Sequence, residues 1–396
     1  QIGDCTILNR SSPVQIGTST NWVKVMAGSN HTIAMKVDGT LWAWGRNIEG
    51  QLGDGTNINR NSPVQISIAT NWANISAGGY HTIAIKTNGS LWAWGSNLDG
   101  QLGDSTTINK NIPQQIGTVT NWASISAGGS HTIALKTDGS LWTWGRNFGV
   151  SVIDDLPDNS YIPFQIGTTT DWASISAGWN HNLALKADGS LWVWGLNDSS
   201  QLGFDSEFKS VSPFQKDSTN NWTNIKAGYY HSTTFKTDGT LWAWGLNSYG
   251  QLGDSTNTSK NSPTRIGLAT NWVDISLGEK HTLALKNDGS LWAWGRNNYG
   301  QIGDGTTTNK NTPTSIACPG VLPVTLTHFT ATKHEKNVLL QWATNTEINS
   351  QAFEIQRSTD GKEFKAISTV AAKGVASEYK FTDSHPLEGL GVVYYR

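Results

Sequence analysis

The sequence is poor in charge and in cysteine. Only 15% of its 396 residues are charged, the formal net charge is −2, and the two cysteines are Cys5 and Cys318. Two cysteines so far apart are too few for a zinc cluster or a disulfide framework, and the sequence leaves open whether they pair. It contains no basic block typical of nucleic-acid binding and no apolar run of about 18 residues that could cross a membrane. We therefore expect neither nucleic acid nor membrane insertion.

Tryptophan and glycine are abundant instead, with 20 and 42 residues, which is typical of an aromatic-packed all-β protein with many tight turns. Several residues recur at intervals of 50. They are His31, His81, His131, His181, His231 and His281, and Trp22, Trp72, Trp122, Trp172, Trp222 and Trp272. Six "LWxWG" stretches follow the same interval and begin at Leu41, Leu91, Leu141, Leu191, Leu241 and Leu291. A period of this length predicts a repeat architecture.

Each repeat predicts four short strands separated by turns. Stretches such as "NWASISAGG", "HTIALK" and "LWAWG" alternate along the chain, as strands that are half-buried do. An Asp-Gly or Asn-Gly pair before "LWxWG" predicts a type I′ hairpin turn. In the second repeat Asn88 replaces the aspartate, so these aspartates are expected to form turns rather than to act as acids. Four strands in each 50-residue repeat favour a β-propeller.

The repeated order "GxxHT-x-A-x-K-x-DG-x-LWxWG-x-N-x-x-GQLG" resembles the RCC1-like repeat family over residues 1–316. The resemblance implies a seven-bladed β-propeller. It also implies an interaction module, because family members include a nucleotide-exchange factor for a small GTPase, bacterial β-lactamase inhibitor proteins and a plant photoreceptor that uses tryptophans at "GWxH" positions.

The seventh blade is incomplete in this chain. The loop that carries a proline occurs seven times, at Pro13, Pro63, Pro113, Pro163, Pro213, Pro263 and Pro313. The segment from tryptophan to "LWxWG" occurs only six times. We expect about thirty upstream residues to complete the seventh blade against residues 301–316.

Residues 317–322 break the period and are expected to form a linker. Residues 323–396 resemble a fibronectin type III-like β-sandwich, truncated at its C-terminus, with Trp342, Tyr394 and Tyr395 as core aromatics. The run "LPVTLTHFTATKHEKNVLLQWATNTEINSQAFEIQRSTDG" is similar to segments that precede the sorting tail of bacterial proteins secreted by the type IX route. This resemblance implies an extracellular or bacterial cell-surface location, and a chain that is a fragment at both ends.

The six repeated histidines are expected to be structural. Symmetry-related histidines on different blades point away from one another, so they do not converge on one metal ion. We expect a ring nitrogen of each to satisfy a backbone group between strands. The "GDGTNIN" loops lack the alternating acidic pattern of a calcium loop, and turn formation is the expected role. The sequence predicts no catalytic residues, no metal site and no cofactor.

The variable positions after "AG" are the candidate partner-binding residues, because positions free to vary on a rigid scaffold can carry function. The candidates here are Asn30, Tyr80, Trp179, Asn180, Tyr229, Tyr230, Glu279 and Lys280. Loops 149–160 and 201–213 also depart from the repeat, and Phe204, Phe208 and the adjoining Phe148 are further candidates. The alternative is that Trp179 and the phenylalanines repack repeats that have drifted.

These features predict a secreted or cell-surface propeller, a monomer without catalysis, that binds an unknown protein or a surface glycan. One alternative is a carbohydrate-active or hydrolytic enzyme that uses acidic loops 154–158 and 205–207. A second is a regulator like the β-lactamase inhibitors or like a GTPase exchange factor. All six repeats have the same length, so none carries an inserted wedge of the kind found in eukaryotic exchange factors, which argues against that role. A purely structural module is the remaining alternative.

Overall fold

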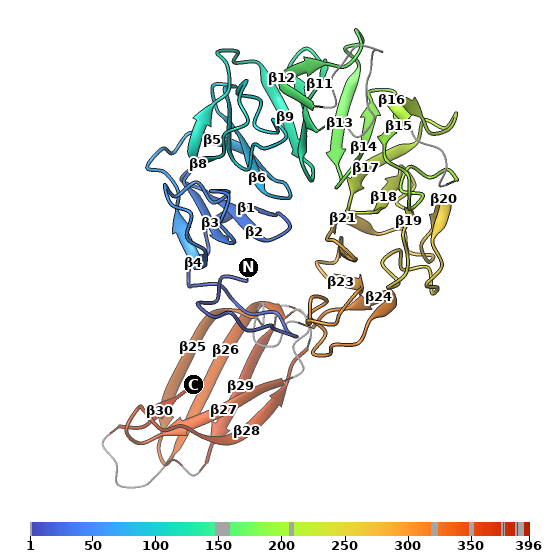
Figure 1. Ribbon diagram of the computed structural model, residues 1–396. Coiled ribbons are helices and arrows are strands. Elements are labelled where there is room, and N and C mark those ends of the chain that lie inside the picture. The colour runs from blue at the N-terminus through green and yellow to red at the C-terminus, as the bar shows by residue number, and fades with distance from the viewer. Residues whose placement is uncertain are drawn as a thin grey trace. The chain divides into compact units, whose positions relative to one another are not determined.

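The computed structural model describes residues 2–146, 159–205, 210–317, 324–347, 352–373, 375, 377–384, 386 and 392–396. The chain divides into two compact units, Gln1–Ala317 and Cys318–Arg396. The described residues form strands and turns (Figure 1). None of them belongs to a helix that is long and apolar enough to cross a membrane.

The first unit contains six antiparallel sheets of four strands, each made from one repeat. Sheets one to three comprise β1 (Trp22–Ala27), β2 (His31–Lys36), β3 (Leu41–Gly45) and β4 (Arg60–Gln65); β5 (Trp72–Ala77), β6 (His81–Lys86), β7 (Leu91–Gly95) and β8 (Lys110–Gln115); and β9 (Trp122–Ala127), β10 (His131–Lys136), β11 (Leu141–Arg146) and β12 (Asn159–Gln165). Within each sheet the strands pair in chain order.

Sheets four to six repeat this arrangement. They comprise β13 (Trp172–Ala177), β14 (His181–Lys186), β15 (Leu191–Gly195) and β16 (Ser210–Gln215); β17 (Trp222–Ala227), β18 (His231–Lys236), β19 (Leu241–Gly245) and β20 (Lys260–Arg265); and β21 (Trp272–Leu277), β22 (His281–Lys286), β23 (Leu291–Gly295) and β24 (Lys310–Ser315). The six sheets follow one another around an axis, as the blades of a propeller do (Figure 1).

The Asp-Gly turns differ from the expected type I′. Asp38 does not have a positive φ, whereas Gly39 has a φ of +76°. Gly39 N–H donates to the Lys36 carbonyl at 2.9 Å, so a type I turn is followed by glycine in the left-handed region. The Asp38 carboxylate accepts hydrogen bonds from the backbone N–H of Thr40 at 2.9 Å and from its hydroxyl at 2.7 Å. The aspartate thus stabilises the turn through its side chain.

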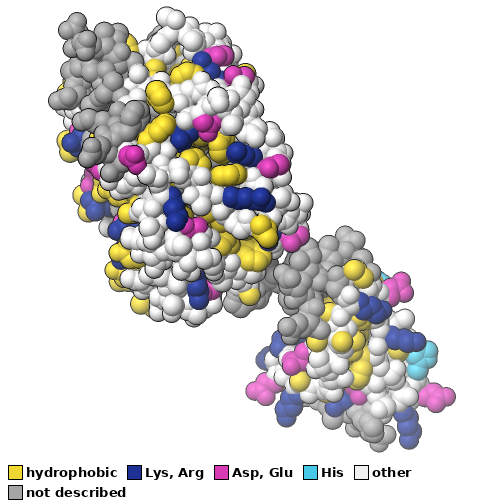
Figure 2. Space-filling model, turned by 90° about the vertical axis from the view of Figure 1, so that its right-hand side faces the viewer, with side chains coloured by type: hydrophobic (Ala, Val, Ile, Leu, Met, Phe, Trp, Pro, Cys, Tyr) yellow, Lys and Arg dark blue, Asp and Glu magenta, His cyan; other side chains and the backbone are white. Residues whose placement is uncertain are grey.

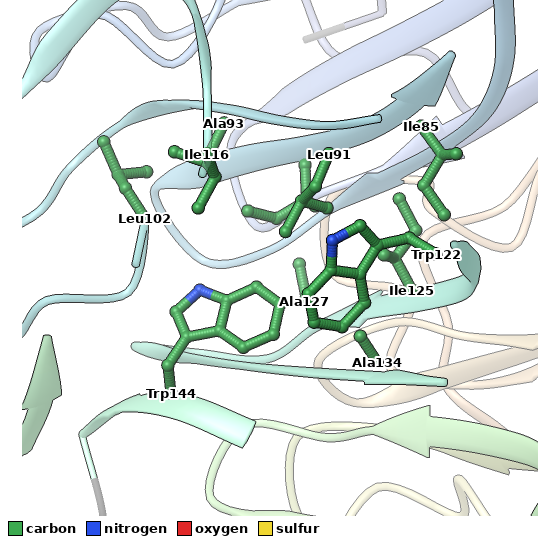
Figure 3. Close-up of a cluster of buried hydrophobic side chains, with 11 residues drawn as sticks. Ile85, Leu91, Ala93, Leu102, Ile116, Trp122, Ile125, Ala127, Ala134 and Trp144 are labelled. Carbon is green, nitrogen blue, oxygen red and sulfur yellow. The ribbon is translucent and has the colours of Figure 1, made fainter. Parts of the chain in front are cut away.

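The hydrophobic core lies between neighbouring sheets. The cluster between the second and third sheets combines aliphatic residues of the second with two tryptophans and three aliphatic residues of the third. Its members are Ile83, Ile85, Leu91, Ala93, Leu102 and Ile116 from the second sheet, and Trp122, Ile125, Ala127, Ala134 and Trp144 from the third. Figure 3 shows Trp122 and Trp144 pointing into this same cluster. A sheet of one repeat cannot bury such a face alone, so the sheets stabilise one another.

The N-terminal segment forms backbone hydrogen bonds with the first sheet and with the loop of the sixth sheet. Gly305 N–H donates to the Ser11 carbonyl at 2.6 Å, and Cys5 N–H donates to the Asn61 carbonyl at 2.9 Å. The same kind of bond joins Gly55 to Asn111 between complete sheets. β24 pairs with β23, so it belongs to the sixth sheet. The expectation that upstream residues complete a seventh blade against residues 301–316 stays a prediction.

The described residues of the second unit form two three-stranded antiparallel sheets. One comprises β25 (Val324–His334), β26 (Asn337–Glu347) and β29 (Glu378–Asp383), and the other β27 (Ala352–Ser358), β28 (Lys365–Ala371) and β30 (Tyr394–Tyr395). Both contribute to one core, in which Trp342 stacks on Tyr379 with ring centroids 5.4 Å apart. Tyr395 packs against this core, but Tyr394 is 45% exposed and is not the core residue that the sequence suggested.

Candidate functional site

Five of the repeated histidines, His31, His81, His131, His181 and His231, are buried between sheets, and His281 in the sixth sheet is partly exposed. In the first five repeats the Nε2 atom contacts a side chain of the next sheet, and the pairs are His31–Thr82 at 3.0 Å, His81–Thr132 at 3.0 Å, His131–Asn182 at 2.8 Å, His181–Ser232 at 2.9 Å and His231–Thr282 at 3.3 Å. The hydroxyl of Thr82 in turn donates to the Gln51 carbonyl at 2.8 Å. The partner is therefore a side chain, where the sequence suggested a backbone group.

Burial keeps these histidines neutral. It lowers the pKa of His81, His181 and His231 to about 3, and the pKa of His31 and His281 to about 4. Removing a charged imidazolium from water is costly, and hydroxyl and amide partners do not repay that cost. A neutral, fully packed imidazole suits a structural role.

Each AGxxH turn joins the first two strands of one sheet, and each of the first four turns is hydrogen-bonded to the turn of the next sheet. Backbone hydrogen bonds link them in sequence, from Ser29 N–H to the Gly78 carbonyl at 3.3 Å, Gly79 to Gly128 at 2.9 Å, Gly129 to Trp179 at 3.1 Å and Trp179 to Gly228 at 3.0 Å. Since His31 pairs with Gly45 across the hairpin, the loop after "LWxWG" lies beside the turn. We call the surface formed by these turns and loops the AGxxH face.

Trp179 lies over the turns of two other sheets. A Cβ atom on Gly79 would lie 2.7 Å from Trp179 Cζ3, and one on Gly129 would lie 2.8 Å from Trp179 Cδ2. Both distances are too short for a real contact, so the ring fits because these two counterparts of Trp179 are glycines. The residues at this repeat position therefore complement one another in space, because the large Trp179 side chain fills the room left by two glycines.

Four of the predicted aromatic residues form a continuous chain of ring contacts. Trp179 meets Tyr80 edge-on at 6.1 Å and stacks on Tyr229 at 4.0 Å with an interplanar angle of 15°. Tyr229 meets Tyr230 edge-on at 5.7 Å, and its hydroxyl lies 3.3 Å from the Ser29 hydroxyl. Burial raises the pKa of Tyr229 to about 12, so its phenol stays protonated. All four rings are half-buried, which leaves part of each accessible on this face.

The polar candidates sit at other places on the same face. The backbone carbonyls of Asn30 and Asn180 accept hydrogen bonds from Arg46 and Leu196, both at 2.8 Å. Glu279 and Lys280 form an ion pair at 3.2 Å in the sixth sheet. The structure thus joins the aromatic candidates in one cluster and pairs the two charged candidates with each other.

Of the three phenylalanine candidates, the structure describes Phe204. Phe204 packs against the core between the fourth and fifth sheets and meets Phe214 edge-on at 5.6 Å, with Lys216 Nζ 4.0 Å from its ring centroid. Phe148 and Phe208 lie outside the described residues. The contacts of Phe204 with the core suit the alternative reading, in which phenylalanine repacks an altered repeat.

The acidic loops give no catalytic geometry in the described chain. Residues 154–158 and 206–207 lie outside the described ranges, and the Asp205 carboxylate accepts a hydrogen bond from the Asn261 amide. In the regular loops Asp54 accepts from the Asn47 amide at 2.9 Å and pairs with Arg60 at 2.7 Å, which fixes the loop. Cys5 is exposed, and its possible partner Cys318 is not among the described residues.

The loops after "LWxWG" carry residues of the AGxxH face that the sequence analysis missed. Arg46 lies over the Tyr80 ring at 5.5 Å, and Arg296 lies over the rings of Tyr249 and Tyr299. The residue that follows the glycine of "LWxWG" varies between arginine, serine and leucine, and this variation could have marked the position as a candidate. On the side of the propeller unit in Figure 2, basic and acidic side chains are intermixed, and apolar patches lie between them.

Comparison with known proteins identifies the family. The model of the RCC1-like domain matches residues 1–214 and 124–344. No curated protein matches the sequence. Among solved structures, human WBSCR16 has a TM-score of 0.69 at 21% identity, covering 80% of this chain and 87% of that one.

Two structures of a yeast protein are similar in the same way. Yeast RCC1 (Prp20) bound to Kap60 has a TM-score of 0.68 at 23% identity, covering 78% of this chain and 77% of that one. Prp20p from Saccharomyces cerevisiae, whose binding to Gsp1p and histones was characterised, has a TM-score of 0.67 at 22% identity, covering 78% and 80%. At this level of identity the structural likeness shows the fold alone, and the match to the family model covers more than half of the sequence. The chain belongs to the RCC1-like domain family.

Proposed function

We propose that this chain is a non-catalytic propeller that binds a protein through its AGxxH face. The observation that carries the proposal is the chain of four aromatic rings, Tyr80, Trp179, Tyr229 and Tyr230, on that face. Clustered tryptophan and tyrosine side chains are typical anchors of protein interfaces. The similar yeast protein Prp20, solved bound to Kap60 and characterised for its binding to Gsp1p and histones, supports a protein as the class of partner.

We also propose a seventh blade, completed by strands beyond those in this chain. Support comes from the apolar residues on either side of the N-terminal segment. Val25 is 62% exposed, whereas its counterpart Ile75 is 1% exposed. Leu285 is 38% exposed, whereas its counterpart Leu135 is 4% exposed. A blade with the repeat sequence would bury both side chains as the complete interfaces do.

The second unit is proposed to be a fibronectin type III-like spacer, and the protein to act as a monomer outside the cell or on a bacterial surface. The support is the resemblance of residues 323–396 to segments that precede type IX sorting tails, together with a core of two sheets around Trp342. A surface glycan is the other partner that the aromatic cluster would suit, because aromatic faces also stack on sugar rings.

The test is partner capture from the native environment by the wild-type chain and by Tyr230→Ala and Trp179→Ala variants. Truncation of hot-spot aromatics typically weakens binding by about 2 kcal/mol or more. Ile68→Ala is the matched control, since Ile68 is 95% exposed near the opposite ends of the strands. We expect both aromatic variants to lose a protein that the control retains.

Because Trp179 also packs on glycines, its variant is interpreted only if it unfolds at the same urea concentration as wild type. Tyr230→Ala supplies the independent measurement. Equal capture by all four proteins would contradict the proposed face. Retention of an oligosaccharide without a protein would replace the protein partner with a glycan.

A further inference from the structure

Arg46 shows how an arginine on the AGxxH face is neutralised within one repeat. Its Nη2 lies 2.7 Å from Glu49 Oε1, and its Nε lies 3.2 Å from Glu49 Oε2. The guanidinium also lies over the Tyr80 ring, with its Cζ 5.5 Å from the ring centroid. Two parallel hydrogen bonds to one carboxylate satisfy the edge of the guanidinium that faces it.

Arg296 occupies the same repeat position in the sixth sheet, but Tyr299 stands where Glu49 would be. Its Cζ lies 5.4 Å from the Tyr249 centroid and 5.2 Å from the Tyr299 centroid, so two rings orient the guanidinium. Among the described residues no carboxylate pairs with Arg296, and its buried Nε has no hydrogen-bond partner. A guanidinium held between aromatic rings loses little further freedom when it binds a planar anion.

A second cation lies beside it. The Lys280 ammonium lies 5.3 Å from the Tyr249 centroid, and the Lys280 carbonyl accepts a hydrogen bond from Arg296 N–H at 2.8 Å. Glu279 pairs with Lys280 through a side chain that is 51% exposed. The group formed by Arg296, Lys280 and Glu279 therefore contains two cations and one carboxylate, and its net charge is positive.

We propose that Arg296, with Lys280 and the flanking Tyr249 and Tyr299, receives an aspartate or glutamate side chain of a protein partner. The carboxylate would lie against the terminal nitrogens of the Arg296 guanidinium, since the Nε atom is buried. This inference rests on the proposed function and specifies the chemistry of the partner, an exposed acidic segment. Arginine and tyrosine are enriched at interface hot spots, which suits this arrangement.

The test uses a fluorescein-labelled peptide of eight glutamates, with an amidated C-terminus, and its all-glutamine counterpart. Binding to the full chain is measured by fluorescence anisotropy at low ionic strength. Two variants address the site: Arg296→Gln removes the cation, and Tyr299→Glu supplies the internal carboxylate that Arg46 already has. Each is expected to weaken binding of the acidic peptide by about tenfold or more.

Two controls carry the same change in charge elsewhere. Arg265→Gln removes an exposed cation and Leu268→Glu adds a carboxylate at a residue that is 86% exposed, both near the opposite ends of the strands. Both are expected to change affinity by about twofold or less, as surface charges do. Equal losses in all four variants would overturn the proposal, because binding would then follow net charge alone.

Absence of binding of the acidic peptide to the wild-type chain would also overturn it. A labelled hexagalacturonate that binds more tightly than the peptide would replace the protein carboxylate with an acidic glycan. The Tyr230→Ala capture experiment is independent of these outcomes. If Tyr230→Ala loses its partner while Arg296→Gln leaves peptide binding unchanged, the proposed function stands and this inference fails.

Discussion

Acidification should destabilise the propeller steeply, because its histidines are buried in the neutral form. In the unfolded chain each imidazole has its ordinary pKa of 6.5, whereas five of the six have folded values of about 3 or 4. A base whose folded pKa is depressed takes up a proton on unfolding at any pH between the two values. Stability is therefore complete above about pH 7 and falls as the pH drops below 6.5.

The expected loss is large. At pH 5 each of these five histidines favours the unfolded state by about 2 kcal/mol, since one pH unit corresponds to about 1.4 kcal/mol. This value depends only on the unfolded pKa, because all five folded values lie below 5. Together they destabilise the fold by about 10 kcal/mol, which is comparable with the whole stability of a typical domain. The propeller should unfold, or lose its terminal sheets, near pH 5.

The measurement is urea unfolding followed by tryptophan fluorescence between pH 8 and pH 5. Near pH 5 the free energy of unfolding should change by about 6 kcal/mol per pH unit, which corresponds to between four and five protons. The His181→Gln variant should lower this slope by one proton, whatever its effect on stability at pH 8. A free energy of unfolding that stays within about 1 kcal/mol from pH 8 to pH 5 would refute the reasoning.

Two further substitutions test the contacts between sheets by urea unfolding at pH 8. Thr132→Val removes the hydroxyl that contacts His81 Nε2 at 3.0 Å and donates to the Gln101 carbonyl at 3.0 Å, and it should cost about 1–3 kcal/mol; an unchanged urea midpoint would contradict the inter-sheet role. Gly129→Ala places a Cβ 2.6 Å from the Trp179 carbonyl oxygen and 2.8 Å from its ring, and it should cost about 1–3 kcal/mol. The loss of stability caused by Gly129→Ala should be smaller in a Trp179→Ala background, but it should not vanish because the carbonyl oxygen remains. Equal losses in both backgrounds would show that the Trp179 ring does not clash with the added Cβ.

Much of the fold could be predicted from the sequence because the repeat encodes it locally. Alternation in "HTIALK" and "LWAWG" determines which side chains face the core, and Asp-Gly places the hairpin between them. The predicted type I′ turn was wrong, since the hydrogen bonds from Thr40 to Asp38 favour a type I turn followed by Gly39 in the left-handed region. Local pattern locates a turn more reliably than it defines the side-chain contacts that select its geometry.

The candidate site could be predicted only in part. Position in the repeat was enough to single out Trp179 and the tyrosines as variable residues on one face. It could not show that Gly79 and Gly129 make room for the Trp179 ring, because these residues lie 100 and 50 positions away and meet it only through packing between sheets. Nor did it single out Arg296, whose environment differs from that of Arg46 because Tyr299 stands in the same loop where Glu49 would be.

The sequence by itself determined the repeat, the four strands of each sheet and the tryptophan and histidine positions, because these depend on periodicities within 50 residues. The tertiary structure alone decided which side chains meet across sheets. It joined the N-terminal segment to the loop of the sixth sheet through Ser11 and Gly305, and it brought turns from five sheets around Trp179 and Tyr229. The physical reason is that such contacts arise from the arrangement of the sheets about the axis, which no single repeat contains.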